Sequence, residues 1–248
     1  MGHLTELDQV FERLLLDSGF RRRYRSGAGD TAVSAAVRQA LSSMDWGEFE
    51  RLARRVRHNV GTGAIGGIAI TKAFQRTLGT LAETPEEQEA VIDRFLASGH
   101  VAQVNAVGNS EGVTVAEAFY RFMMDDSRSM ATRLAAQHEF CAAVLHILGA
   151  TERVGFIVES GLIRRHDNGA VAVLDANRPL EDADQEPEHC LAIGVTRNGY
   201  WSGAVTKPTA AALLLRAHSS PSWAVRVAED HRGDIDLIEE EIRRRKLM

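Results

Sequence analysis

Two Asn-Gly pairs, at residues 168–169 and 198–199, constrain the fold of this chain more than any other feature of its sequence. Each pair stands between two short runs in which apolar and polar residues alternate. The four runs cover residues 162–167, 170–175, 191–197 and 200–205. An Asn-Gly pair between alternating runs predicts a two-residue turn, because both turn positions need a positive φ. We therefore expect two β-hairpins, and we expect the acidic segment between them, residues 178–189, to form a flexible loop.

Three short helices are predicted after the second hairpin. Pro208 opens the first of them, over residues 210–217. Ser220 is expected to cap the second, with Pro221 at its first position, and Asp234 to cap the third. The apolar residues of the third helix recur at helical spacing and are Ile235, Ile238 and Ile242. The sequence of residues 151–248 thus predicts a winged-helix-like module of β-hairpins and three helices.

The first part of the chain shows the helical period instead. Apolar residues recur every three or four positions there, and several helix start signals precede them. Thr5 precedes the first such helix, residues 84–87 and 114–117 read as capping boxes, and residues 129–148 form the last predicted helix. The fold class that we expect is α+β, with an all-helical domain over residues 1–150 and the winged-helix-like module over residues 151–248.

Composition and charge exclude several classes of function. The chain has 44% hydrophobic and 25% charged residues, which is ordinary globular composition. Its net charge is −5, and neither half has more basic than acidic residues, so we expect no nucleic acid as a partner. No apolar run approaches the roughly 18 residues that a membrane span needs, and no signal sequence opens the chain. We expect no membrane association and a cytoplasmic location.

The residues that could take part in catalysis or metal binding form no recognisable motif. Residues 61–66 match the dinucleotide-binding pattern Gly-x-Gly-x-x-Gly by letter, but a charged helical segment precedes them where that motif needs a buried strand. Cys141 and Cys190 fit no metal or redox spacing and are expected to be reduced thiols, buried or half-buried. His138, Glu139 and His146 could serve an enzyme only if they converged in a pocket. We therefore expect no catalytic residue, no metal and no cofactor.

The predicted sheet offers a binding mechanism. A sheet edge beside a helix can accept an extended peptide as an added strand, with main-chain hydrogen bonds for affinity. The residues expected to bind a peptide are Tyr200, Trp201, Ser202 and Ala204 of the last strand, with Ile235 and Ile238 of the last helix. An alternative is that the isoleucines only face the core. Of Ser202 and Ala204, we expect one to face the incoming strand, and residues 162–167 form a competing edge.

Residues 162–248 resemble the PqqD-like peptide-recognition element of ribosomal peptide natural-product (RiPP) pathways. The residues that carry the resemblance are the hairpin at 168–169, the helix-opening run 208–214, residues 222–225 and the closing run 238–248. The resemblance implies that this part of the chain captures a leader or precursor peptide. An extra hairpin and a long acidic loop depart from the family pattern.

The helical part is similar to the partner subunits of multinuclear non-haem iron peptide-modifying enzymes. Residues 95–98 and 113–122 carry this second resemblance. It implies a heterodimer in which a (β/α)₈-barrel enzyme holds the iron and this chain helps to bind the precursor peptide. The function expected is a noncatalytic accessory subunit. The alternative is a winged-helix transcriptional regulator or adaptor protein, although the last helix carries acidic residues where a DNA reader needs basic ones.

Overall fold

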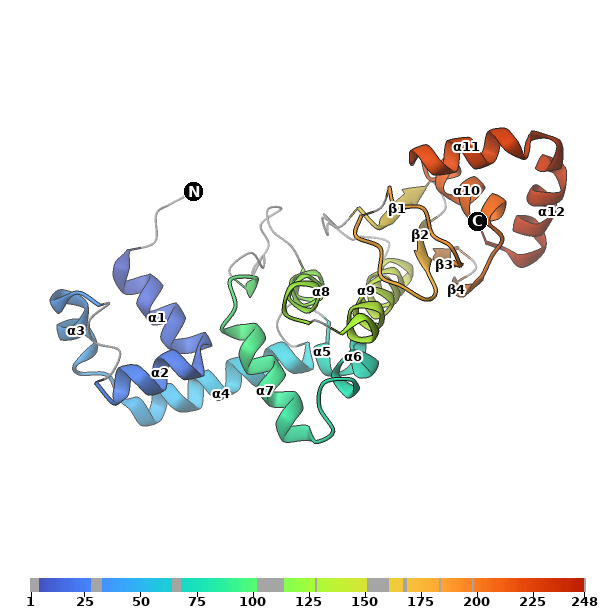
Figure 1. The fold of residues 1–248 in the computed structure, drawn as a ribbon. Coiled ribbons are helices and arrows are strands. Elements are labelled where there is room, and N and C mark those ends of the chain that lie inside the picture. Colours follow the sequence, from blue (N-terminus) through green and yellow to red (C-terminus); the bar gives the residue numbers. More distant parts are fainter. Residues whose placement is uncertain are drawn as a thin grey trace.

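The computed structural model confirms the α+β fold class: a helical N-terminal part precedes a module of β-hairpins and helices (Figure 1). It describes residues 5–27, 33–63, 68–101, 114–127, 129–150, 161–166, 169–182, 184–197 and 199–247. Among these described residues, no helix is both long enough and apolar enough to cross a membrane.

Four helices form the N-terminal end of the molecule. They are α1 (Glu6–Leu16), α2 (Ser18–Arg25), α3 (Ala35–Leu41) and α4 (Trp46–Thr62). Their apolar faces meet in a cluster that includes Leu14, Phe20 and Phe49. The start signal at Thr5 is confirmed, because its hydroxyl accepts a hydrogen bond from the Asp8 amide in a capping box.

Five further helices surround the largest apolar core. They are α5 (Ile70–Ala73), α6 (Gln75–Gly79), α7 (Pro85–Leu96), α8 (Val115–Asp126) and α9 (Met130–Ala150). The rings of Phe74, Phe95 and Phe119 meet edge to face with centroids 4.8–5.2 Å apart, a favourable arrangement for aromatic side chains. The capping box at residues 84–87 is present. At residues 114–117 only half of the expected box exists, because the buried Glu117 side chain pairs with Arg121 instead.

The four strands form one antiparallel sheet in the order β1-β2-β3-β4. The strands are β1 (Ile163–His166), β2 (Gly169–Asp175), β3 (Cys190–Thr196) and β4 (Gly199–Ala204). Both predicted hairpins are confirmed, but their extents differ by one residue. His166 pairs with Gly169 and Thr196 with Gly199, so each glycine is the first residue of a strand rather than part of a two-residue turn. The turn residues 167, 168 and 198 lie outside the described residues.

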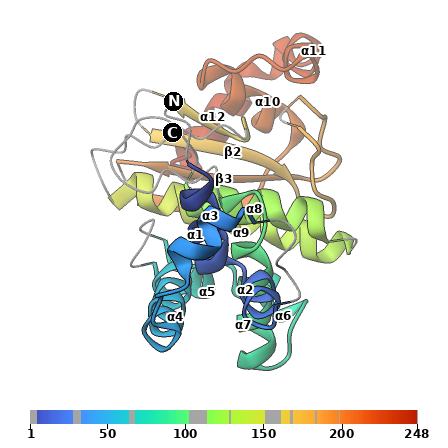
Figure 2. The same ribbon diagram turned by 90° about the vertical axis from the view of Figure 1, so that its left-hand side faces the viewer.

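Helices cover both faces of the sheet, so that three layers result (Figure 2). Ala172, Leu174 and Ile193 belong to the same core as Phe140 and Leu145 of α9. That core joins residues from both sides of position 150. The opposite face packs against the C-terminal helices α10 (Lys207–Arg216), α11 (Ser222–Asp230) and α12 (Ile235–Arg245), with a short 3₁₀ turn, η3 (Arg232–Asp234), before α12.

The caps of the C-terminal helices correct two expectations. The first residue before α11 is Pro221, which provides no side-chain cap, so Ser220 is not the N-cap. Asp234 does precede α12, but its carboxylate lies 3.0 Å from His231 Nδ1 and does not cap the helix. Thr206 caps α10 through a hydrogen bond from the Thr209 amide, a signal that the sequence reading missed.

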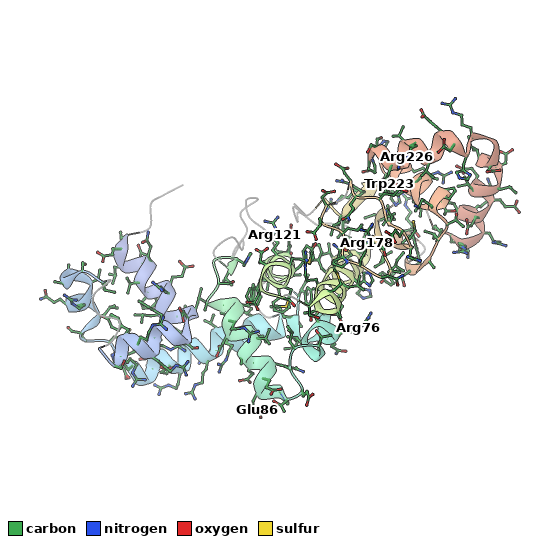
Figure 3. The ribbon with its side chains drawn as sticks, viewed as in Figure 1. Arg76, Glu86, Arg121, Arg178, Trp223 and Arg226 are labelled. Carbon is green, nitrogen blue, oxygen red and sulfur yellow. The ribbon has the colours of Figure 1, made fainter. Side chains whose placement is uncertain are left out.

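Polar contacts tie the connection between β2 and β3 to both helical layers. The Gln137 side chain of α9 donates to the Leu180 carbonyl and accepts from its amide, both over 2.9 Å. Glu186 pairs with Lys207 of α10 over 2.7 Å and with Arg226 of α11. Arg178 and Arg226 are labelled in Figure 3. The segment expected to be a flexible loop is therefore irregular in backbone but held at several points.

Candidate functional site: the outer edge of β4

β4 forms one edge of the sheet, and its backbone groups alternate in direction. The amide of Val205, directly after β4, donates to the Cys190 carbonyl of β3 over 3.1 Å. Because the direction alternates along an antiparallel strand, Trp201 and Gly203 also bond to β3. The residues whose backbone groups point away from β3 are Tyr200, Ser202 and Ala204. In the part of the chain that the structure describes, no strand pairs with this outer side of β4.

Ser202 and Ala204 therefore present their backbone groups to the same side. The expectation that only one of them faces an added strand was wrong, because residues two apart in a strand point their amides in the same direction. Gly203, between them, is the position whose backbone faces β3. An edge of this kind offers alternating donors and acceptors to an extended peptide.

The side chains of β4 also divide between the two faces of the sheet. Tyr200 pairs with Val195 of the α9-facing core, and its ring meets that of His146 with centroids 6.0 Å apart. Ser202 shares this face and is exposed. Tyr200 is 43% exposed, so its ring is available to a molecule bound along the edge.

Trp201 points to the opposite face, toward α12. Its indole lies over Gly194, where a Cβ atom would come within 2.3 Å of the ring. Trp201 and Ile238 pack against the same apolar cluster, which contains Leu213 and Ile242. These two predicted site residues thus lie against one shared cluster. The indole Nε1 of Trp201 is buried without a hydrogen-bond partner among the described residues.

Ile235, the last predicted site residue, lies one turn before Ile238 and is 52% exposed. It is not a core residue, whereas Ile242 of the same helix is buried. The C-terminal end of α12 contacts the edge directly: Arg245 Nη1 donates to the Ala204 carbonyl over 2.8 Å. The predicted residues are therefore arranged along β4 and α12, with Ile235 on the solvent side. Peptide binding at these residues stays a prediction.

A pocket of about 460 Å³ lies beside Tyr200 on the α9 side of β4. Its lining comes from β4, from α9 and from α5 with the residues before it. The lining residues are Ile68, Ala69, Lys72, Ala73, Glu139, Ala142, Ala143, His146 and Tyr200. The sequence reading did not place this pocket, because α5 and α9 are far apart in the chain. The small alanines of α9 were the one local signal for it.

The three residues of the enzyme hypothesis do not all converge: Glu139 and His146 line the pocket beside Tyr200, but His138 does not. His138 Nε2 lies 2.9 Å from the Asp175 carbonyl, and burial lowers the pKa of His138 even though this contact acts to raise it. Glu139 accepts hydrogen bonds from the amides of Arg76 and Thr77 at the start of α6, over 2.7 and 2.9 Å; Arg76 is labelled in Figure 3. His146 instead meets Tyr200. Within the described residues, no group of three His, Cys, Asp or Glu side chains could hold a metal ion.

The two cysteines and the first glycines of the Gly-x-Gly-x-x-Gly pattern have structural roles. Cys141 and Cys190 are buried thiols, and burial raises the pKa of each of them. Gly61 is the penultimate residue of α4, and Gly63 caps that helix with φ +82°. The first glycines of the Gly-x-Gly-x-x-Gly pattern thus end a helix, whereas a dinucleotide site needs them between a strand and a helix start. Residues 64–66 of the pattern lie outside the described residues.

Comparison with known proteins identifies no relative of this chain. No protein-family model matches it, and neither a curated protein nor a solved structure does.

Proposed function

We infer that this chain is a noncatalytic accessory subunit that captures a ribosomally made precursor peptide and presents it to a partner iron-dependent enzyme. The observation that carries the inference is the outer edge of β4, where Tyr200, Ser202 and Ala204 direct their backbone groups away from β3. The peptide binds there as a fifth strand. Its main-chain groups supply the affinity, because each strand residue can exchange hydrogen bonds with the edge.

Two walls flank this edge and support a peptide-binding role. On one side α12 contacts β4 through Arg245 and shares an apolar cluster with Trp201. On the other side α9 contacts β4 through His146 and Tyr200. A strand lying between two helices receives specificity as well as affinity, because its alternate side chains meet different walls.

Exposed apolar side chains at the opposite end of the molecule support a protein partner. Leu7 and Phe11 of α1 and Leu52 of α4 are each 38–39% exposed. Phe11 and Leu52 line one shallow pocket together with Phe49. Apolar side chains grouped on a surface in this way are typical of protein interfaces. The partner that we propose for this surface is the (β/α)₈-barrel enzyme that holds the iron, in a heterodimer located in the cytoplasm.

Selection from an mRNA-displayed library of random 12-residue peptides tests the peptide-binding role. Enriched peptides are labelled with fluorescein and titrated against the wild type and two proline variants by fluorescence polarisation. Ser202→Pro removes an amide that points outward, which an edge strand tolerates, and should abolish binding while circular dichroism shows a native fold. Gly203→Pro removes an amide that bonds to β3 and should disturb the sheet itself.

Undiminished affinity in folded Ser202→Pro would contradict strand addition at β4, and so would a library that yields no binder. Sequence-selective binding of a random duplex DNA library would instead favour the winged-helix regulator.

Purification of the tagged chain from its source cells tests the partner. We expect an iron-containing (β/α)₈-barrel protein to co-purify with the wild type and with Leu237→Glu, which alters an exposed residue of α12. The (β/α)₈-barrel protein should not co-purify with Leu52→Glu, which places a charge in the apolar surface of α1 and α4. Retention of the enzyme by Leu52→Glu would show that the partner docks elsewhere.

A further inference from the structure

We propose that the pocket between α5, α9 and Tyr200 is a specificity subsite that takes one apolar side chain of the peptide added to β4. This inference rests on the proposed function, because the peptide strand must lie along β4 for its side chain to reach the pocket. It goes further by naming the chemical class of the residue that is recognised and the helices that recognise it.

The register of the edge directs a peptide side chain to this pocket. Tyr200 belongs to both the edge and the pocket. Its backbone groups point away from β3, and its side chain lines the pocket. Side chains of neighbouring strands that lie beside each other share one face of the sheet. A peptide residue beside Tyr200 therefore points toward α9, as Tyr200 does. The residues before and after it in the peptide point toward α12.

The lining of the pocket favours an apolar occupant. Its most buried lining residue is Ile68, which is 5% exposed, and Ala69, Ala73, Ala142 and Ala143 supply small apolar walls. The short alanine side chains leave room for a large side chain between α5 and α9. A leucine or phenylalanine placed there would lose most of its contact with water, which is the source of apolar affinity.

The carboxylate of Glu139 is not free to select a basic residue. Both carboxylate oxygens of Glu139 are occupied by the start of α6, where they accept from Arg76 and from Thr77. Lys72 and His146 are exposed and lie at the rim. Tyr200 lies both on the edge of the sheet and in the wall of the pocket. A side chain of the peptide bound along that edge is therefore the occupant of the pocket.

A double-mutant cycle between protein and peptide tests this subsite. Ala142→Phe fills the pocket from α9, and Ala131→Phe makes the same change at an exposed position of that helix. The probe is the fluorescein-labelled peptide enriched from the displayed library, together with the variants in which each apolar residue in turn is replaced by glycine. Affinities are measured for all combinations with the wild type, Ala142→Phe, Ala131→Phe and Ser202→Pro.

For one peptide position, we expect glycine to weaken binding to the wild type and to Ala131→Phe by about tenfold or more. The same glycine should change the affinity of Ala142→Phe by less than about twofold, because the filled pocket no longer receives the side chain. If Ala142→Phe does not fold, His146→Trp fills the pocket from its exposed rim and takes its place in the cycle.

The outcomes separate this inference from the proposed function. An equal effect of every glycine substitution in wild type and Ala142→Phe, with binding still lost in Ser202→Pro, overturns the subsite and leaves strand addition intact. Binding that survives in Ser202→Pro overturns both, because the peptide then lies elsewhere.

Discussion

Arg245 of α12 donates a hydrogen bond from Nη1 to the backbone carbonyl of Ala204, over 2.8 Å. That carbonyl belongs to the outer edge of β4, so the arginine occupies an acceptor that an added strand would use. Arg245 also pairs with Glu241 one turn earlier, over 3.2 Å. Its side chain is 43% exposed, which leaves it able to move aside. Arg245 would thus compete with the proposed peptide for the C-terminal end of β4.

Arg245→Ala should therefore strengthen peptide binding. Removing the guanidinium frees the Ala204 carbonyl for a peptide amide, and we expect the affinity to rise about two- to tenfold, the range of one hydrogen bond. Fluorescence polarisation with a library-selected peptide measures the effect. Arg244→Ala, at the neighbouring exposed position of α12, is the control and should leave the affinity unchanged. Weaker binding to Arg245→Ala would show that the arginine contacts the peptide rather than competing with it.

Glu139 stabilises the fold by holding the start of α6. Its carboxylate accepts from the amides of Arg76 and Thr77 and from the Thr77 hydroxyl over 2.7–2.9 Å. We expect Glu139→Ala to lower the free energy of unfolding by about 1–2 kcal/mol, as loss of a helix cap does. Urea denaturation measures it, with Glu240→Ala at an exposed position of α12 as the control. Equal midpoints for the two variants would exclude this capping role.

Local signals made much of the fold predictable. The Thr84 cap is formed by residues three positions apart in sequence, and each hairpin closes within a few residues, so both can be read directly. Contacts between distant segments could not be read. The bond between Thr77 and Glu139 spans 62 positions, and nothing in either segment alone indicates the other. The packing of α9 against the sheet, which joins both parts of the chain in one core, depends on contacts of this kind.

The candidate site, too, could be predicted from the sequence only in part. Tyr200, Ser202 and Ala204 could be placed on one strand because their alternation is local, and the last strand of a meander lies at an edge. The pocket beside Tyr200 required the approach of α5 to α9, which no spacing in the sequence encodes. Arg245 was missed for the same reason, since it reaches Ala204 across 41 positions.

Gly169 is required by the close approach of two strands. A Cβ atom at this position would lie 1.8 Å from the Val195 carbonyl oxygen, which belongs to the backbone of β3 and cannot rotate away. We expect Gly169→Ala to cost more than about 3 kcal/mol of folding free energy, since the strands must separate to accept it. Gly203→Ala is the matched control, because a Cβ atom there meets nothing within 4 Å among the described residues. Thermal unfolding followed by circular dichroism distinguishes the two, and similar melting temperatures would contradict the register.

Asp175 at the end of β2 should make stability depend on pH in the acidic range. Its buried carboxylate accepts from the amides of Asn177, Glu188 and His189 over 2.6–3.2 Å, and so shapes both ends of the connection to β3. Burial alone would raise the pKa of this carboxyl, but the backbone hydrogen bonds outweigh it and hold the pKa below its usual value.

Because the folded state binds the proton of Asp175 less readily than the unfolded state, the ionised carboxylate stabilises the fold. This contribution is complete above the unfolded pKa of about 3.9 and is lost as the pH falls through the lower folded value. Urea denaturation between pH 6 and pH 3 should show the wild type losing stability more steeply below about pH 4.5 than Asp175→Asn, which cannot titrate. The other acidic residues are common to both proteins, so their contribution cancels in the comparison. Parallel stability curves over this range would contradict the prediction, because they would mean that the pKa of Asp175 is the same in the folded and unfolded states.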